Sequence, residues 1–253
     1  MPSAPMRPEV WQPSTHQPPP APDEIHVWRI DLAAAAGSPE HAPVLSPDEV
    51  ERAGRLLHKH KRDQFIAGRS ALRRLLGHYL GEAPQSLAFH YGPHGKPALV
   101  TATTDAALTF NLSNSQDLAL LAVATAREVG IDLEYRHRGI SVTPLARHIL
   151  CESEAAALQR LPAERHAQAL LAAWTRKEAY VKALGVGLAR SMKSVPAGIA
   201  DDDKTIVCQL EDADGEPRSW RFIPLAVHPD YLACLASPGA GVTLRCLDWR
   251  PAP

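Results

Sequence analysis

Residues 108–134, LTFNLSNSQDLALLAVATAREVGIDLE, contain three apolar segments of strand length in quick succession. These segments cover 108–112, 118–124 and 129–134, and short polar connections separate them. Connections this short favour antiparallel pairing between neighbouring strands. The stretch therefore predicts an antiparallel sheet in the middle of the chain, and its last strand carries two acidic side chains.

The chain before this stretch begins with a strand and continues into helices. Residues 25–32 have the length and the apolar character of a strand. Ser46 can cap a helix in which Pro47 takes the first position and Glu49 completes a capping box. This helical pattern extends with one break to Leu80, and a further strand is predicted over 87–91.

The chain after the stretch repeats this order of elements. A helical pattern covers 143–184, with an interruption near Pro162, and short strands follow it. The predicted strands are 205–210, 220–225, 231–235 and 242–247. Because each half has a strand, then helices, then strands, we predict an α+β fold of two similar lobes, 24–128 and 129–253. A cleft between such lobes would be the natural site.

The first 23 residues form a leader that is rich in proline and poor in apolar side chains. Proline favours extended, solvated backbone, and a segment of this composition has little surface to pack. We therefore expect residues 1–23 to be a disordered tail. A ligand for a proline-binding partner is the alternative.

The composition is that of an ordinary soluble protein. Of the 253 residues, 45% are hydrophobic and 22% are charged, and the formal net charge is −1. These values argue against a fibrous chain and against one that coats nucleic acid. The four cysteines lack C-x-x-C and zinc-ligand spacing, and neither a membrane span nor a secretion signal is visible. We expect a cytoplasmic monomer that binds neither nucleic acid nor a membrane.

Three further segments offer groups that could bind an anion. Basic residues gather between Arg52 and Arg74, either as a solvated helix face or as an anion site at one end of it. FNLSNS at 110–115 ends a strand in small hydrogen-bond donors, and Lys96 lies in the turn GPHGKP at 92–97. The alternatives are a polar turn and an exposed hairpin tip. The Lys96 turn lacks the glycine spacing and the serine or threonine of a phosphate loop.

The segment GIDLE at 130–134 can present two carboxylates together. The two-residue period of a strand places Asp132 and Glu134 on one face and directs Ile131 and Leu133 toward the core. Magnesium prefers a few carboxylate oxygens and keeps positions open for water and phosphate oxygens. Acidic and apolar residues also alternate on many half-exposed strands, so this segment alone does not establish a metal site.

The segment WTRKEAYVKALG at 174–185 predicts a helix with a charged pair on its apolar arc. With about 100° per residue, Glu178 and Lys182 fall beside Trp174 and Val181. The outward face then belongs to Arg176, Ala179 and Ala183. Inward charges need partners, because unpaired buried charge is costly, and a metal ion and a phosphate would supply them. The alternative is a surface pair that contributes about 0.2–0.5 kcal/mol.

Taken together, these segments resemble the 4′-phosphopantetheinyl transferases of the larger, surfactin-synthetase-activating type. GIDLE is similar to the G-I-D-x-E strand of that family, and 174–185 is similar to its W-x-x-K-E-A-x-x-K-x-x-G helix, in the same order. GKP at 95–97, FNLS at 110–113, and LSP at 45–47 with the Gly68-Arg69 helix match further segments. The likeness covers residues 25–247.

The resemblance implies two α+β lobes related by a pseudo-twofold axis, with coenzyme A and magnesium bound between them. By the same resemblance, Asp132, Glu134 and Glu178 would hold the magnesium ion against the pyrophosphate, and Lys182 would contact a phosphate. The residues implied for the nucleotide end and its 3′-phosphate are Lys96, Ser113, Arg52 and, more weakly, Arg69.

One position departs from the family pattern. The family usually has histidine after the serine of F-N-x-S-H, whereas this chain has Asn114. Asn114 is still a candidate for binding the coenzyme, because its amide can donate a hydrogen bond to a phosphate. It cannot become cationic.

The activity implied by the resemblance is transfer of 4′-phosphopantetheine from coenzyme A to a serine of an apo acyl or peptidyl carrier protein. Such carriers serve fatty acid, polyketide and nonribosomal peptide synthesis, and 3′,5′-ADP is released. Glu178 is the predicted general base, directly or through a metal-bound water, and Lys182 adds positive charge. The alternatives are a metal-dependent hydrolase of coenzyme A or a related pyrophosphate, and a carrier-binding module without catalysis. The intact Asp132, Glu178 and Lys182 argue against the last.

Overall fold

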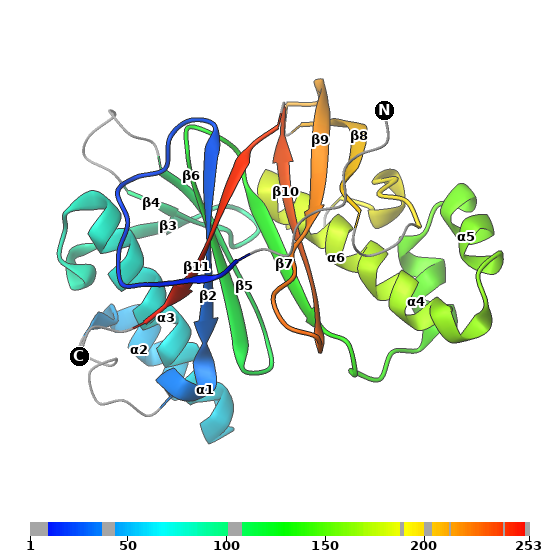
Figure 1. Cartoon of the computed structure of the whole chain (residues 1–253). Helices are drawn as coiled ribbons and strands as arrows, with labels where there is room; N and C mark the ends of the chain where they lie inside the picture. Colours follow the sequence, from blue (N-terminus) through cyan, green and yellow to red (C-terminus); the bar gives the residue numbers. More distant parts are fainter. Residues whose placement is uncertain are drawn as a thin grey trace. The chain divides into compact units, whose positions relative to one another are not determined.

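The computed structural model describes residues 10–36, 44–100, 108–187, 190–199, 204–212, 214–239 and 241–250. The chain divides into two compact units, and Figure 1 labels most of their helices and strands. The N-terminal unit comprises Trp11–His90, Pro97–Ala126 and Val242–Pro253. The C-terminal unit comprises Tyr91–Lys96 and Arg127–Gly241, and also Met1–Val10, of which only Val10 is described.

A mixed sheet with the strand order β1-β11-β2-β6-β5 forms the centre of the N-terminal unit. Its strands are β1 (Gln12–Ser14), β2 (Glu24–Asp31), β5 (Leu108–Ser115), β6 (Leu118–Thr125) and β11 (Thr243–Trp249). β11 runs parallel to β1 and to β2, whereas β2, β6 and β5 pair antiparallel. The short strands β3 (Phe89–Tyr91) and β4 (Pro97–Leu99) pair with each other.

The helices of this unit are α1 (Leu32–Ala35), α2 (Pro47–Gly54), α3 (Lys59–Leu80) and the 3-10 turn η2 (Pro84–Ser86). The predicted capping box at Ser46 starts α2, with Glu49 as its acidic partner. Gly81 ends α3 with a φ of 66°, a left-handed conformation that glycine adopts without strain. The buried side of α3 packs against the core that Trp28 and Ile30 of β2 provide.

The sheet of the C-terminal unit is antiparallel and has the order β7-β10-β9-β8. Its strands are β7 (Gly130–Tyr135), β8 (Ile206–Glu211), β9 (Pro217–Pro224) and β10 (Tyr231–Pro238). The helices are α4 (Val142–Ile149), α5 (Glu152–Gln159) and α6 (His166–Leu184), with the 3-10 turns η3 (Ala163–Arg165) and η5 (Met192–Ser194). α6 contacts β7 and β10, and Tyr180 meets Trp220 edge to face at 4.8 Å between ring centroids.

The two units share one internal order of elements. In the N-terminal unit, helices and the β5–β6 hairpin follow β2, and β2 pairs with β6. In the C-terminal unit, helices and the β9–β10 hairpin follow β7, and β7 pairs with β10. The predicted α+β class with two similar halves is therefore confirmed.

Two predictions about strand pairing are wrong. β6 and β7 follow each other closely along the chain but belong to different sheets. The strand predicted over 242–247 in the second lobe is β11, which pairs with β2 in the N-terminal unit. The predicted ranges 24–128 and 129–253 therefore differ from the units, because apolar patterning identifies a strand without identifying its partners.

The leader was expected to be disordered through residue 23, and the structure corrects its second half. Residues 1–9 lie outside the described residues. Beyond them, Gln12–Ser14 pair with β11, and the Arg29 guanidinium lies 4.6 Å from the ring centroid of Trp11. Thr125 also donates a hydrogen bond to the Pro20 carbonyl oxygen at 2.8 Å. Residues Gln12–Ser14 of the leader are consequently an edge strand of the sheet.

Within the described ranges, no helix combines the length and the apolar character that crossing a membrane requires.

Candidate functional site

Gly130 allows α6 to lie close against the start of β7. A Cβ atom at Gly130 would overlap the Ala179 carbonyl oxygen and would lie 2.9 Å from the Cα atom of Ala183. Backbone atoms cannot retreat from such an overlap without moving the helix. The glycine of the GIDLE segment therefore sets the distance between the strand that carries Asp132 and Glu134 and the helix that carries Glu178 and Lys182.

Lys182 of α6 forms an ion pair with Asp132 of β7. The Lys182 Nζ lies 2.5 Å from the Asp132 Oδ1, and the Asp132 side chain is 5% exposed. The Lys182 side chain is 29% exposed, so water reaches the ammonium side of the pair while the carboxylate is enclosed by the protein. The structure thus brings together two of the residues that the sequence singled out.

Glu134 and Glu178 complete an acidic cluster with Asp132. Burial raises the pKa of Glu178, and the nearby charge of Asp132 raises it further, against the opposing effect of Lys182. Burial also raises the pKa of Glu134, and Asp132 again adds to the shift. A carboxylate that raises the pKa of two others in this way must lie close to both of them. The three carboxylates predicted from two distant segments therefore share one electrostatic environment.

Two side chains hold Glu134 in place. The Trp174 indole donates from Nε1 to the Glu134 Oε1 at 2.9 Å. The Arg138 Nη1 lies 2.6 Å from the Glu134 Oε2, and the Arg138 guanidinium lies 5.9 Å from the centroid of the Trp174 ring. Sequence reasoning assigned no role to Arg138, because it follows β7 in a turn where no periodic pattern marks it.

The chemistry of the cluster suits a hard divalent cation, although its oxygens already contact cations and donors of the chain. Three carboxylates with mutual repulsion are the ligand type that magnesium prefers. Among the described residues, however, no set of three His, Cys, Asp or Glu side chains is arranged as a metal site. Lys182 contacts Asp132, and Arg138 with Trp174 contacts both oxygens of Glu134. The predicted magnesium site stays a prediction.

The helical-wheel argument was wrong about the outward face of α6. Arg176, Ala179 and Ala183 were expected to face solvent, but all three are buried, at 2%, 0% and 4% exposure. α6 packs against β7, β10 and the neighbouring helices α4 and α5. A helix enclosed by neighbours in this way has no simple outward face, so periodicity alone could not orient it.

Lys96 lies in the C-terminal unit and contacts the last turn of α6. Its Nζ donates to the Ala183 carbonyl oxygen at 2.7 Å, next to Gly185, which ends the helix with a φ of 70°. Burial lowers the pKa of Lys96 to about 8, against the effect of Glu128. Its predicted role at the nucleotide end of coenzyme A stays a prediction.

The remaining candidates for binding coenzyme A lie in the N-terminal unit. Arg52 is exposed on α2, whereas Arg69 is buried on α3 and donates from Nε to the Glu49 Oε1 at 2.7 Å. Near the end of β5, Ser113 is buried and Asn114 is exposed. The ion pair gives Arg69 a structural role, and the binding roles of all four residues stay predictions.

Sequence reasoning also missed Lys177, which is fully buried between Arg176 and Glu178. The same wheel contained a usable signal. With about 100° per residue, Lys177 falls within about 20° of Leu170, between Leu170 and Ala173 on the wheel. A lysine in that position requires buried acceptors, so the pattern could have predicted an anchored ammonium group.

Comparisons with known proteins identify relatives of this chain. Residues 128–236, which contain the acidic cluster, match the family model of the 4′-phosphopantetheinyl transferase superfamily. The chain is 35% identical over 230 residues to 4′-phosphopantetheinyl transferase HetI of a Nostoc species, which covers 90% of this chain and 91% of that protein. It is 32% identical over 184 residues, 73% of each chain, to a putative 4′-phosphopantetheinyl transferase, slr0495, of a Synechocystis species.

A more distant relative is a 4′-phosphopantetheinyl transferase of Bacillus subtilis, 23% identical over 211 residues, which cover 80% of this chain and 91% of that protein. All of these relatives are named as transferases of one kind. The chain belongs to the 4′-phosphopantetheinyl transferase superfamily.

Proposed function

We propose that this protein transfers the 4′-phosphopantetheine group of coenzyme A to a serine of an apo acyl or peptidyl carrier protein and releases 3′,5′-ADP. The observation that carries the proposal is the cluster of Asp132, Glu134, Glu178 and Lys182, placed by β7 and α6 in a chain of this superfamily. A named relative whose match covers nine tenths of the chain supports the reaction class.

In this reaction the serine hydroxyl oxygen forms a bond to the phosphorus that bears the pantetheine arm. The bond from that phosphorus to the bridging oxygen breaks, and 3′,5′-ADP leaves with the electron pair. The serine proton passes to Glu178, whose pKa is raised by burial and by Asp132 and so moves toward the range of an effective general base. Positioning and charge neutralisation supply most of the catalysis in phosphoryl transfers.

Lys182 supplies a positive charge for the transferred phosphate. In the structure its ammonium group pairs with Asp132, so the same side chain can stay within reach of both the carboxylate and a bound phosphate. Trp174 and Arg138 keep Glu134 oriented beside it. Asp132, Glu134 and Glu178 would hold a magnesium ion, which, when bound, would neutralise charge on the pyrophosphate.

The decisive experiment separates transfer from hydrolysis. Coenzyme A, magnesium and apo acyl or peptidyl carrier proteins are incubated with the protein, and the carriers are weighed by mass spectrometry while 3′,5′-ADP is quantified. We expect one phosphopantetheine per carrier, equal amounts of 3′,5′-ADP, and no product after chelation of magnesium. Release of 3′,5′-ADP without a carrier would instead show a hydrolase. Carrier binding without either product would show a binding module.

A further inference from the structure

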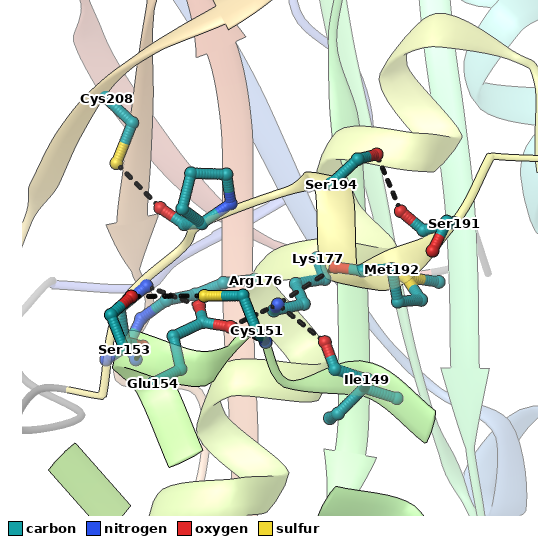
Figure 2. A network of polar contacts seen from close by, with 12 residues as sticks. Ile149, Cys151, Ser153, Glu154, Arg176, Lys177, Ser191, Met192, Ser194 and Cys208 are labelled. Carbon is teal, nitrogen blue, oxygen red and sulfur yellow. Dashed lines mark hydrogen bonds and ion pairs between the residues drawn. The ribbon is translucent and has the colours of Figure 1, made fainter. Parts of the chain in front are cut away.

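Lys177 takes part in a network of polar contacts that Figure 2 shows from close by. Its Nζ donates to the Glu154 Oε2 at 2.6 Å, to the Ile149 carbonyl oxygen at 2.7 Å and to the Met192 carbonyl oxygen at 2.9 Å. The side chains of Lys177 and Glu154 are 0% and 3% exposed. Three segments that are distant in sequence therefore converge on one ammonium group.

The hydrogen-bonding capacity of Lys177 is fully used within the protein. A protonated lysine has three N–H groups, and three acceptors lie at hydrogen-bond distance. In this arrangement Lys177 has no donor left for a substrate phosphate, although it is the neighbour of Glu178 in sequence. Its contribution to the transfer reaction must be made through the position of the helix.

Glu154 extends the network to two further backbone groups. Its Oε2 accepts from the Cys151 backbone N–H at 3.1 Å, which completes the capping box of α5. Its Oε1 accepts from the Gly198 backbone N–H at 2.9 Å. Figure 2 shows Ile149, Met192 and Glu154 around the Lys177 ammonium group. The network thus joins α6 to the end of α4, the start of α5, and the segment from η5 to Gly198.

Anchoring Lys177 fixes the rotation of α6 about its own axis. Consecutive residues of a helix point about 100° apart, and residues four apart share a face. With Lys177 held on one side, Glu178 and Lys182 are both directed to the side where Asp132 and Glu134 lie. A helix free to rotate by a few degrees would move these groups away from the reacting atoms.

We propose that Lys177 and Glu154 form a positioning pair for the transferase reaction, which sets the rotation of α6 and so places Glu178 and Lys182 against β7. This inference rests on the proposed function. The pair acts through the helix and does not touch the substrate.

A double-mutant cycle separates positioning from stability. Lys177→Met removes the ammonium group but keeps much of the side-chain volume, and Glu154→Gln keeps an acceptor for the Gly198 N–H. Each single variant leaves one buried charge without its partner and lowers the melting temperature. Lys177→Met with Glu154→Gln removes both charges, so its melting temperature returns close to that of the wild type.

The activity of the double variant decides the question. If the pair positions the helix, kcat for carrier modification stays reduced by about 100-fold although the melting temperature recovers. KM for coenzyme A and for the carrier changes by less than about twofold, because no substrate contact is lost. Amide hydrogen exchange over 170–184 becomes faster in the same variant without any substrate present. Should kcat recover together with the melting temperature, the pair would be merely structural and the proposal would be overturned.

A matched control exists in the N-terminal unit. Arg73 is 1% exposed and, like Lys177, donates to one carboxylate and two carbonyl oxygens, those of Glu49, Pro84 and Leu87. Arg73→Met should lower the melting temperature to a similar extent while kcat at saturating substrates stays within about threefold of the wild type. A loss of kcat equal to that of Lys177→Met would show that any buried cation has this effect, and would overturn the proposal.

The proposed function is tested separately by the wild-type protein in the same assay. If the wild type fails to modify any carrier, the function is wrong, and the hydrogen-exchange comparison still reports whether the pair fixes α6. If the wild type is active and the double variant matches it in kcat and in exchange over 170–184, only the positioning proposal fails.

Discussion

The two units anchor their long helices with the same device. In each, a short helix begins with a capping box whose glutamate, Glu49 on α2 or Glu154 on α5, turns its carboxylate inward. A cation from the next long helix then binds that carboxylate and two carbonyl oxygens. The cation is Arg73 on α3 and Lys177 on α6.

The two units differ in the residue that follows the anchoring cation on the long helix. The residue after Lys177 is Glu178, which joins the acidic cluster with Asp132 and Glu134. The residue after Arg73 is Arg74, which is not acidic. Glu49 also forms an ion pair with a second arginine of α3, Arg69. One anchoring arrangement therefore occurs twice, and among the described residues the acidic cluster accompanies the copy in the C-terminal unit. This separation lets each unit serve as a control for the other.

The largest expected effect is that of Gly130→Ala, which tests the close approach of α6 to β7. Because the new Cβ would meet backbone atoms of Ala179 and Ala183, we expect a loss of about 3 kcal/mol of unfolding free energy and no measurable transfer. Gly68 on α3 is the control, since its Cβ would meet only Leu32 Cδ2 at 3.6 Å. Gly68→Ala should stabilise by about 0.5–1 kcal/mol. Urea unfolding of both variants measures the contrast, and a tolerated Gly130→Ala would contradict it.

Glu178→Gln should abolish most of the activity while sparing the fold. Removing the predicted general base should lower kcat by about 1,000-fold. The raised pKa means that the charged carboxylate costs free energy in the folded state, so the melting temperature should stay unchanged or increase. Glu152→Gln, an exposed acid on α5, is the matched control and should behave as the wild type. Turnover of Glu178→Gln within about tenfold of the wild type would remove Glu178 from the mechanism.

Local patterns predicted the elements of the fold well, because each is recorded in a short stretch of sequence. Ser46 and Glu49 marked the start of α2, and the alternation in GIDLE marked β7. The position of β11 beside β2 could not be predicted in this way, since pairing between residues 24–29 and 243–248 depends on the whole fold.

The same contrast holds for the candidate site. Asp132, Glu134, Glu178 and Lys182 could be chosen from strand and helix periods together with the family resemblance, and the structure brings them together. The groups that hold them come from turns or from other elements. Arg138, and the carbonyl oxygens of Ile149 and Met192, leave no periodic trace in the sequence.

Lowering the pH should have a smaller effect, which acts on the ion pairs of Glu49 with Arg73 and Arg69 in the N-terminal unit. Burial acts to raise the pKa of Glu49, but the hydrogen bond from Arg73 and the charge of Arg69 outweigh it and leave the pKa below its ordinary value. A carboxyl group with a lowered folded-state pKa stabilises the protein above the unfolded-state pKa, and this stabilisation is lost as the pH falls through the folded-state value.

Comparison with Glu49→Gln measures this contribution. At pH 7 we expect the variant to be less stable by about 3 kcal/mol, because Arg73 and Arg69 lose their charged partner. Below a pH of about 4.3, Glu49 of the wild type takes up a proton when the protein unfolds. The difference in unfolding free energy between the wild type and the variant should therefore shrink as the pH falls. Urea unfolding of both proteins between pH 7 and 3 gives the two curves. If the two curves of unfolding free energy against pH stayed parallel, protonation of Glu49 would not contribute to the pH dependence of stability.

The smallest effect concerns β1, an edge strand without a counterpart among the described strands of the C-terminal unit. Deleting residues 1–9 should change neither stability nor transfer. Deleting residues 1–16 also removes β1 and the contact between Trp11 and Arg29, and it exposes the edge of β11. Ordering a three-residue strand costs about 1–2 kcal/mol per residue in backbone entropy, so most of the gain from these contacts is already offset.

We therefore expect the longer deletion to lower the unfolding free energy by only about 1 kcal/mol, or a few degrees in the melting temperature, and to leave kcat unchanged. Calorimetry of both deletions beside the full chain checks this. A large loss of unfolding free energy in the longer deletion would show that the N-terminal unit needs β1 for its stability. The elements that both units share would then not be enough to stabilise this unit. A fall in kcat/KM for the carrier that is already complete in the shorter deletion would assign residues 1–9 to partner docking.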